Sequence, residues 1–453
     1  MYILKHVFSK KQSLYFGILL LLAVSGCRKS GYLIEHTDLI TDLGGGTGTV
    51  TWSSDKNYLI SGFVFVNDGQ TLTIEPGTVI RAKTGQGTLA SALIVARGGH
   101  IIAEGTPSEP IIFTVEGDDL EGSVPVEARG LWGGVIVLGN APVNTDTGED
   151  LIEGIPLSEP RGVYGGIDED DNSGILRYVS IRHGGTNIGE GNEINGLTLG
   201  GVGRQTIIDH VEVIANEDDG VEFFGGTVNC KNIVVAFCGD DAFDLDQGYR
   251  GKCQFLLGIN QGYSDRGIEC SGGLQPLQIL PDAFPTMYNI TLFGYPENSS
   301  IPLIDFYSFG AGHIRNSLLQ YPGKGIAISN SGASGDAYSM FENGSITLDN
   351  NEYYAPSDSI LHIYSYNQLN EQFMTENAIL ADSLEQWNNF FSNVLGLDGS
   401  NIQWLPQTTI FEALADYNSD WYEVVPYKGA FGSENWIEGW TLLWEQGLNE
   451  IAE

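Results

Sequence analysis

The chain has 453 residues, including 60 glycines, and a formal net charge of −37 from 58 acidic and 21 basic side chains. So strong a negative charge repels phosphate backbones and anionic membrane surfaces, which argues against proteins that act by binding nucleic acid. Divalent cations and neutral or cationic ligands are the partners that this charge favours, and the length suits a solenoid with one additional domain.

Residues 1–26 have the features of a signal peptide. Lys10 and Lys11 supply the positive charge, and the apolar run over 14–24 is shorter than a membrane span. The run ends in Ala-Val-Ser-Gly-Cys, which resembles the lipobox of bacterial lipoproteins. The resemblance implies that Cys27 is lipidated and that the protein is anchored to the outer membrane, with the periplasmic and cell-surface leaflets both open.

Residues 49–349 read as strands separated by turns, after a flexible glycine-rich tether over 27–48. Continuous apolar runs such as 92–96 fit parallel strands that are buried on both faces. Two proline-containing stretches near 141–174 and 272–286 interrupt the pattern and are expected to be loops that project from the coils.

Three segments repeat one pattern of residue types. The segments 218–223, 240–245 and 265–270 begin 22 and 25 positions apart, and each reads polar, polar, small, apolar, acidic, apolar. A period of this length with alternating character indicates a structural unit stacked on copies of itself. The repeat predicts an all-β solenoid, because one coil cannot bury its apolar side alone.

Residues 350–453 change in character and are expected to form a mixed helical capping domain. Apolar residues recur at helical spacing over 366–395, and six of the eight tryptophans lie from Trp387 onward. Ser433 is a candidate N-cap of a short helix near the C-terminus. We expect this domain to cover the last coil, because a solenoid end exposes unpaired strand backbone.

Several of these runs resemble lipid-anchored, right-handed parallel β-helix lipoproteins of Bacteroidota. The matching runs are 72–80, 92–99, 131–139 and 171–179, together with the ending over 427–441. The resemblance implies a right-handed parallel β-helix in the cell envelope. It implies no particular reaction, because a fold alone does not determine an activity.

Aligned coils place acidic residues in columns. Thr198, Glu222, Asp244 and Glu269 fall in one column with apolar neighbours on both sides, so this column is expected to face outward. A second column, with Asp219 and Asp241 beside it, is formed by Asp218, Asp240 and Asp265.

Carboxylates about 4.8 Å apart repel one another, so something must offset the repulsion. The candidates are water and counter-ions, raised pKa values, bound Ca²⁺, or the nearby basic residues Arg250, Lys252 and Arg266. The columns therefore permit three interpretations: a solvated acidic face, a binding face or an active site.

In the second interpretation the columns bind carbohydrate with the support of Ca²⁺. The candidate binding residues are Glu222, Asp244, Glu269 and Asp218, and Tyr249 could stack on a sugar ring. In the third, a polysaccharide-degrading hydrolase or lyase uses paired carboxylates as acid and base. Its candidate catalytic residues are Asp240, Asp241, Asp244, His183 and Arg250.

Other candidates carry weaker patterns. Asp168, Asp170 and Asn172 alternate as in Ca²⁺ loops, but the glycine follows one place late, so an exposed acidic turn competes with a metal site. His183 lies at a turn, where a structural histidine bonded to a turn carbonyl competes with a catalytic base. The thiols fit no zinc pattern, and disulfides remain open for Cys230, Cys238, Cys253 and Cys270.

These observations favour a non-catalytic envelope lipoprotein that binds or scaffolds a carbohydrate or a protein. The outer membrane is its expected partner through the lipid anchor, with a glycan or an envelope protein as ligand. No cofactor is required by the sequence, and Ca²⁺ is compatible with it. The alternative is a polysaccharide-degrading enzyme of the β-helix type.

Overall fold

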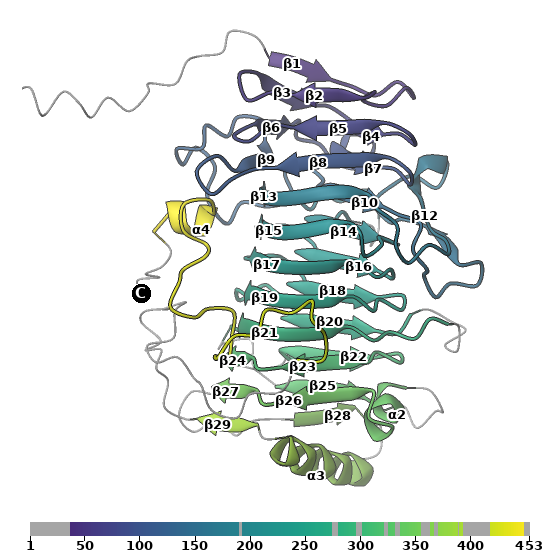
Figure 1. The fold of residues 1–453 in the computed structure, drawn as a ribbon, viewed down its shortest axis with the longest axis vertical. Helices are drawn as coiled ribbons and strands as arrows, with labels where there is room; N and C mark the ends of the chain where they lie inside the picture. Colours follow the sequence, from purple (N-terminus) through teal and green to yellow (C-terminus); the bar gives the residue numbers. More distant parts are fainter. Residues whose placement is uncertain are drawn as a thin grey trace, which may run out of the picture. The chain divides into compact units, whose positions relative to one another are not determined.

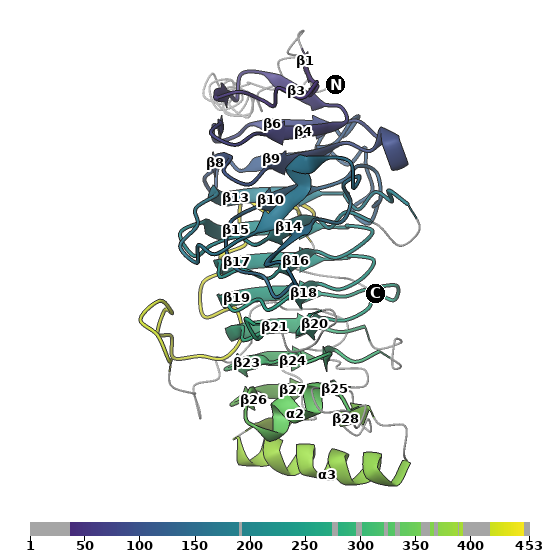
Figure 2. The same ribbon diagram turned by 90° about the vertical axis from the view of Figure 1, so that its right-hand side faces the viewer.

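The computed structural model describes residues 37–189, 193–273, 280–295, 301–320, 325–330, 336–354, 363–366, 370–387, 389–392 and 417–447. The chain divides into one unit over 1–37 and a second over 38–453. The signal peptide and Cys27 lie outside the described residues, so both stay predictions. The second unit is a right-handed parallel β-helix, as predicted, whose coils stack one on the next (Figure 1, Figure 2).

A ten-stranded parallel sheet forms one wall of the coils. Its strands are β4 (Phe63–Val66), β7 (Ala92–Val95), β10 (Val135–Leu138), β14 (Leu197–Gly200), β16 (Val221–Phe224), β18 (Phe243–Asp246), β20 (Ile268–Ser271), β22 (Ile304–Tyr307), β25 (Ile326–Ser329) and β28 (Ile363–Tyr366).

A seventeen-stranded sheet forms the rest of the coils. Its strands are β1 (Thr37–Ile40), β2 (Val50–Trp52), β3 (Asn57–Ile60), β5 (Thr71–Ile74), β6 (Val79–Ala82), β8 (His100–Glu104), β9 (Ile111–Val115), β13 (Gly174–Arg182), β15 (Ile207–Ile214), β17 (Asn229–Ala236), β19 (Lys252–Ile259), β21 (Thr286–Phe293), β23 (Gly312–Arg315), β24 (Leu318–Gln320), β26 (Ile346–Asp349), β27 (Glu352–Tyr354) and β29 (Phe390–Ser392).

Each long strand of this larger sheet turns a corner at one residue of positive φ. Tyr178, His210, Asn232, Phe255 and Asn289 have φ values between 50° and 60°. Backbone pairing skips these residues and resumes in register beyond them. Asparagine tolerates this left-handed conformation better than most residues do. Because these five coils bend at the same position, their equivalent side chains stay stacked from coil to coil.

Columns of apolar side chains fill the interior. Leu199, Phe223, Leu245, Cys270 and Phe306 lie opposite one another in consecutive strands, and each is at most 2% exposed. Burial of one large apolar side chain contributes roughly 1.5–3 kcal/mol. The contacts that achieve this burial run between coils, so stacking stabilises the fold more than any one coil does.

The four cysteines of the repeat region are buried free thiols. Cys230 and Cys253 lie opposite each other in β17 and β19, with their Sγ atoms 3.3 Å apart. This contact and burial together raise the pKa of the Cys230 thiol well above its usual range.

The stretch over 141–174 leaves the regular coils and packs against the ten-stranded sheet. It contains the antiparallel pair β11 (Glu149–Leu151) and β12 (Val163–Gly165), followed closely in sequence by β13. It also contains apolar residues that pack against the outer face of the ten-stranded sheet, namely Val143, Ile152, Ile155 and Tyr164. We call residues 141–174 the insertion, and it covers the outside of the first strands of that sheet.

The expected tether is ordered in its described part. Asp42 accepts hydrogen bonds from the backbone N–H groups of Gly44 and Gly46 at 2.7 and 2.9 Å. Its carboxylate also lies 2.6 Å from the Arg161 guanidinium of the insertion, and its side chain is only 1% exposed. The prediction of a flexible segment is therefore wrong for residues 41–48, because one carboxylate satisfies the amides of the glycine-rich turn.

The last coils are followed by helix α3 (Asn370–Gln386), while α2 (Ala337–Glu342) lies beside β25 and β26. Leu380 and Leu384 of α3 are buried in the main core. Helix α3 contacts β28 and therefore covers the final coil (Figure 1). Among the described residues, no helix has both the length and the apolar character needed to cross a membrane.

Residues 417–447 do not cap the last coil. We call them the strap, because they run back along the outside of the seventeen-stranded sheet (yellow in Figure 1). The Tyr422 hydroxyl donates to the carbonyl oxygen of Thr286 at 2.7 Å, and Trp440 packs edge-on against Tyr178. The strap ends in the short helix α4 (Leu442–Glu445), whose N-cap is Thr441 and which begins later than the helix predicted after Ser433.

Candidate functional site: an acidic ladder on the ten-stranded sheet

The ten-stranded sheet places acidic residues of successive coils opposite one another. The register aligns Thr198 with Glu222, then with Asp244, Glu269 and Asp305. The predicted column is therefore present, and it is one carboxylate longer than expected. Because their strand neighbours point into the core, these carboxylates lie on the outside of the coil. They are nevertheless recessed, since Glu222 and Asp305 are only 6% and 5% exposed.

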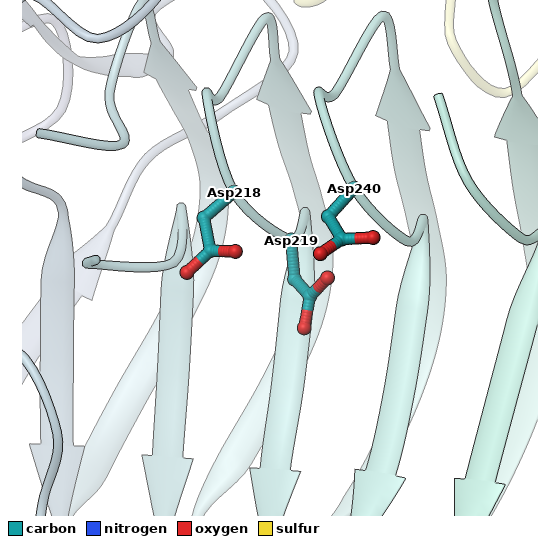
Figure 3. A group of neighbouring side chains, drawn as sticks. All are labelled: Asp218, Asp219 and Asp240. Carbon is teal, nitrogen blue, oxygen red and sulfur yellow. The ribbon is translucent and has the colours of Figure 1, made fainter. Parts of the chain in front are cut away.

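The turns that precede these strands carry the second set of acids. The backbone N–H of Asp241 donates to the Asp219 carboxylate at 2.8 Å, so a side chain of one coil holds the backbone of the next. Figure 3 shows that Asp218, Asp219 and Asp240 gather their carboxylates at adjacent turns. We call the combined set the acidic ladder: Asp218, Asp219, Glu222, Asp240, Asp241, Asp244, Glu269 and Asp305.

Burial and mutual repulsion disfavour full ionisation of the ladder. Desolvation, followed by the charges of Glu153 and Asp240, raises the pKa of Asp218 to about 8. Desolvation and the charge of Asp265 raise the pKa of Asp240 to about 6. Burial also raises the pKa values of Glu222 and Asp244 well above their usual range, with neighbouring acids adding to the effect. Protons or a cation would therefore offset the repulsion within the ladder.

Arg266 neutralises one end of the ladder. Its guanidinium lies 3.2 Å from Glu269 and 3.1 Å from Asp305, and it also pairs with Asp265. At the other end, none of the ion pairs in the described part of the chain involves Asp219, Glu222 or Asp244. The ladder thus has a half with its own internal cation and a half without one.

The half without a cation has the chemistry of a hard-metal site. Asp219, Glu222 and Asp244 each offer one carboxylate oxygen, and these oxygens all lie within 4.8 Å of one another. Two further groups of this kind include Asp240. An all-oxygen donor set suits Ca²⁺ or Mg²⁺, whereas zinc prefers nitrogen and sulfur. The residues therefore fit the Ca²⁺ that the sequence allowed.

Two residues outside the repeat pattern also reach this half. Asn195 precedes β14 and donates through Nδ2 to Glu153 Oε1 at 3.1 Å and to Glu222 Oε2. Glu153 belongs to the insertion, and after burial its charge is the next cause that raises the pKa of Glu222. Glu153 could not be predicted from the repeat, because an acid in an aperiodic loop shares no register with the coils.

Tyr307 lies at the edge of the ladder. It is opposite Ser271 in the neighbouring strand and is only partly buried. Burial and the charges of Glu269 and Asp244 raise the pKa of its hydroxyl. Its ring could stack on a ligand, which is the role that we expected of Tyr249.

Tyr249 cannot take that role. It is fully buried inside the coil, where its ring stacks on Phe223 with centroids 4.3 Å apart. Its hydroxyl donates to the carbonyl oxygen of Val228 at 2.8 Å. The prediction is wrong because Tyr249 follows a turn through Gly248, which has a positive φ, and its ring lies inside the coil.

The proposed catalytic set is only partly assembled. Asp240, Asp241 and Asp244 belong to the ladder, but Arg250 pairs with Glu169 of the insertion at 3.0 Å. His183 is buried at a turn, and its Nδ1 lies 2.6 Å from the carbonyl oxygen of Ala128, as a structural histidine would. Within the described part of the chain, neither residue forms a hydrogen bond or an ion pair with a carboxylate of the ladder.

In the loop with Asp168, Asp170 and Asn172, each of the three side chains has a different partner. Asp168 accepts from the backbone N–H of Asp170 at 3.0 Å, and Asn172 accepts from that of Gly174 at 2.9 Å. Asp170 forms an ion pair with Arg204 at 3.0 Å. These contacts describe an exposed acidic turn, the alternative to a metal site.

Comparison with known proteins gives one family and one distant structure. The family described as "Pectate-lyase like beta helix domain" matches residues 44–390. The crystal structure of an alginate lyase from Paenibacillus sp. str. FPU-7 is 14% identical and covers 65% of this chain and 86% of its own, with a TM-score of 0.30. No curated protein matches the chain.

Proposed function

The chain belongs to the family of pectate-lyase-like β-helix domains, and on that premise we propose that its acidic ladder binds carbohydrate through Ca²⁺ without cleaving it. The observation that carries the proposal is the contrast between the two halves of the ladder. Arg266 supplies a positive charge to one half, whereas Asp219, Glu222 and Asp244 converge without one. A divalent cation would offset their repulsion, and it could keep coordination positions open for sugar hydroxyl groups.

A carbohydrate is the favoured ligand because the surface combines carboxylates with an aromatic ring. Glu269 and Asp244 can accept hydrogen bonds from hydroxyl groups, and the partly buried Tyr307 adjoins them. A sugar ring can pack its apolar face on such an aromatic side chain while its hydroxyls reach the carboxylates. An envelope protein with a cationic surface is the other ligand that this charge would accept.

We extend the proposal to the location of the protein. Lipidation at Cys27 would anchor it to the outer membrane and would place the ladder in the envelope, where glycans occur. Metabolic labelling with a fatty-acid analogue tests this part, because a Cys27→Ser variant should lose both the label and the membrane fraction. Label retained in that variant would refute the anchor and leave the binding proposal intact.

Binding is tested with the full-length chain in detergent on a glycan array, with CaCl₂ or with EDTA. We expect binding in Ca²⁺ only, and a Ca²⁺ affinity about tenfold lower, or about 1.4 kcal/mol, in Glu222→Gln. Glu116→Gln is the matched control, because Glu116 is an exposed acid outside the ladder. The proposal would be refuted if glycan binding were unchanged both by EDTA and by the Glu222→Gln substitution.

Cleavage of a polysaccharide is the second candidate, and one observation favours it. A carboxyl group with a pKa of about 6, that of Asp240, adjoins acids that can accept a proton. Such a pair could serve as general acid and base near neutral pH. Incubation with polysaccharides would then yield reducing ends or unsaturated products, which Asp241→Asn should abolish. A binding protein yields neither.

A further inference from the structure

Two of the four buried cysteines face each other across neighbouring coils. Cys230 and Cys253 occupy the second positions of β17 and β19, and the register of the sheet pairs them directly. Their Sγ atoms lie 3.3 Å apart, and the two residues are 2% and 0% exposed. A pair of thiols in contact inside the core can be joined covalently without any rearrangement of the strands that carry it.

The other two cysteines have different partners. The Cys238 thiol donates to the carbonyl oxygen of Ala236 at 3.8 Å, and the Cys270 thiol donates to that of Ala311 at 3.2 Å. Cys270 lies between two apolar side chains of the neighbouring strands and not opposite a cysteine. The contact between Cys230 and Cys253 is therefore specific to one position of the repeat.

The geometry of this pair suits a disulfide. Neighbouring strands lie about 4.8 Å apart, within the range of about 4.4–6.8 Å that Cα atoms span across a disulfide. From their separation of 3.3 Å, the two sulfurs need to approach by roughly 1.2 Å to reach the bond length of about 2.05 Å. The Tyr249 hydroxyl, 3.4 Å from Cys253 Sγ, would keep its 2.8 Å hydrogen bond to the Val228 carbonyl oxygen. Oxidation would thus leave this hydroxyl with a partner.

We propose that Cys230 and Cys253 form a disulfide when the exported chain meets an oxidising envelope, and that this bond ties together the coils that carry the ladder. The proposal rests on the envelope location proposed above, because intracellular thiols are kept reduced. The bond closes the segment 230–253, which contains Asp240, Asp241 and Asp244. It therefore holds in place the turn and the strand that present three carboxylates of the ladder.

The oxidant is the disulfide of an envelope thiol oxidoreductase. The thiolate of one cysteine attacks that disulfide, which forms a mixed disulfide and releases one thiol of the oxidoreductase. The second cysteine attacks the mixed disulfide and releases the other thiol, so two protons and two electrons pass from the chain to the oxidant. The stacked coils bury both cysteines. We therefore expect the exchange to occur before the two coils close, and the finished bond to be protected from reductants.

Peptide mapping tests the bond on the full-length chain, isolated from membranes in detergent and treated with iodoacetamide in urea without reductant. Trypsin places the four cysteines in separate peptides, because it cleaves after Arg204, Lys231, Arg250, Lys252, Arg266 and Arg315. We expect peptides 205–231 and 253–266 to be joined, and Cys238 and Cys270 to carry the label. Four labelled cysteines would overturn the proposal.

Refolding of the reduced chain from urea with a mixture of reduced and oxidised glutathione separates the geometry from the location. Labelled thiols at Cys230 and Cys253 after refolding as well would show that the pair does not bond at all. A bond that forms on refolding but is missing from the isolated chain would overturn the proposed oxidation in the envelope. Neither result bears on the binding of Ca²⁺ or glycan by the ladder.

Cys253→Ala removes one sulfur of the bond, and Cys238→Ala is the matched control because it removes another buried thiol. We expect the oxidised wild type to melt about 3–6 °C above the wild type refolded with dithiothreitol. Cys238→Ala should show the same difference, and Cys253→Ala should melt at one temperature with or without the reductant. A reductant-dependent Tm in Cys253→Ala would contradict the pairing, and circular dichroism checks that both variants are folded.

Discussion

The backbone N–H of Arg266 donates a 2.5 Å hydrogen bond to the carboxylate of Asp241, one coil earlier. This bond fixes the start of β20 and sets the Arg266 guanidinium beside Glu269 and Asp305. Asp241 thus positions the backbone of Arg266, and the Arg266 side chain neutralises Glu269 and Asp305. The positive charge at this end of the ladder is therefore held in place by a hydrogen bond between adjacent coils.

Replacement of Arg266 by methionine should leave Glu269 and Asp305 without a counter-charge. We expect the free energy of unfolding to fall by roughly 2–3 kcal/mol, below the value for a fully buried pair because the side chain is 22% exposed. Urea unfolding in EDTA measures the loss. Arg204→Met is the control, since that exposed ion pair should contribute less than about 1 kcal/mol. Equal losses in the two variants would contradict the role given to Arg266.

Stability in EDTA should fall as the pH rises. Asp218 and Asp240 have pKa values of about 8 and about 6, both raised, so the folded chain holds these protons more tightly than the unfolded chain. Their contribution is complete below the unfolded pKa of about 4 and is lost as the pH passes through 6 and 8. We expect Tm to drop by about 3–5 °C between pH 5.5 and 8.5.

Calorimetric scans across that range provide the measurement. Asp218→Asn should flatten the pH dependence, because the variant side chain does not titrate. Asp68→Asn, a change of an exposed acid, should leave it as steep as in the wild type. A Tm that rises with pH in EDTA would show that the ladder acids are not desolvated in this way.

Neutralising Asp244 should stabilise the chain when no metal is present. One of its carboxylate oxygens is buried without a hydrogen-bond partner, and the charges of Asp246 and Glu269 oppose its ionisation. We expect Asp244→Asn to raise the free energy of unfolding in EDTA by about 1–2 kcal/mol and to reduce the gain on adding Ca²⁺. Asp209→Asn should have the opposite sign, because Asp209 pairs with Arg177 at 3.2 Å.

The strap should be detachable by one substitution. Trp440 is fully buried and stacks near Trp436 and the His210 ring. Trp440→Ala should lower the free energy of unfolding by about 3–5 kcal/mol and expose residues 417–447 to protease. Val424→Ala is the control, because Val424 is 80% exposed. Protection equal to that of the wild type would mean that the strap is held elsewhere.

The sequence was sufficient for the stacked coils and for much of the ladder, because in-register coils make spacing in the chain equivalent to position in space. Glu222, Asp244 and Glu269 follow each other by 22 and 25 residues and are adjacent in the structure. Asp305 was not predicted to join the column, because it follows Glu269 by 36 residues and the spacing of the repeat is lost there.

Residues outside the register could not be placed in this way. Glu153 joins the ladder from the insertion, and Tyr249 turns inward after a bend that period-two alternation does not describe. The position of the strap could not be predicted either. Its tryptophans indicated a packed segment, but spacing along the chain does not reveal which surface such a segment covers.

In a stack of coils each member contacts only its neighbours, so the array can fray one coil at a time from either end. The strap changes this. It is bound to more than one coil: the Leu442 N–H donates to the Glu212 carboxylate in β15, and the Tyr422 hydroxyl donates to the Thr286 carbonyl in β21, three strands further along the sheet. The strap thus links coils that would otherwise unfold independently. The coils from β15 to β21 should therefore unfold in one cooperative step.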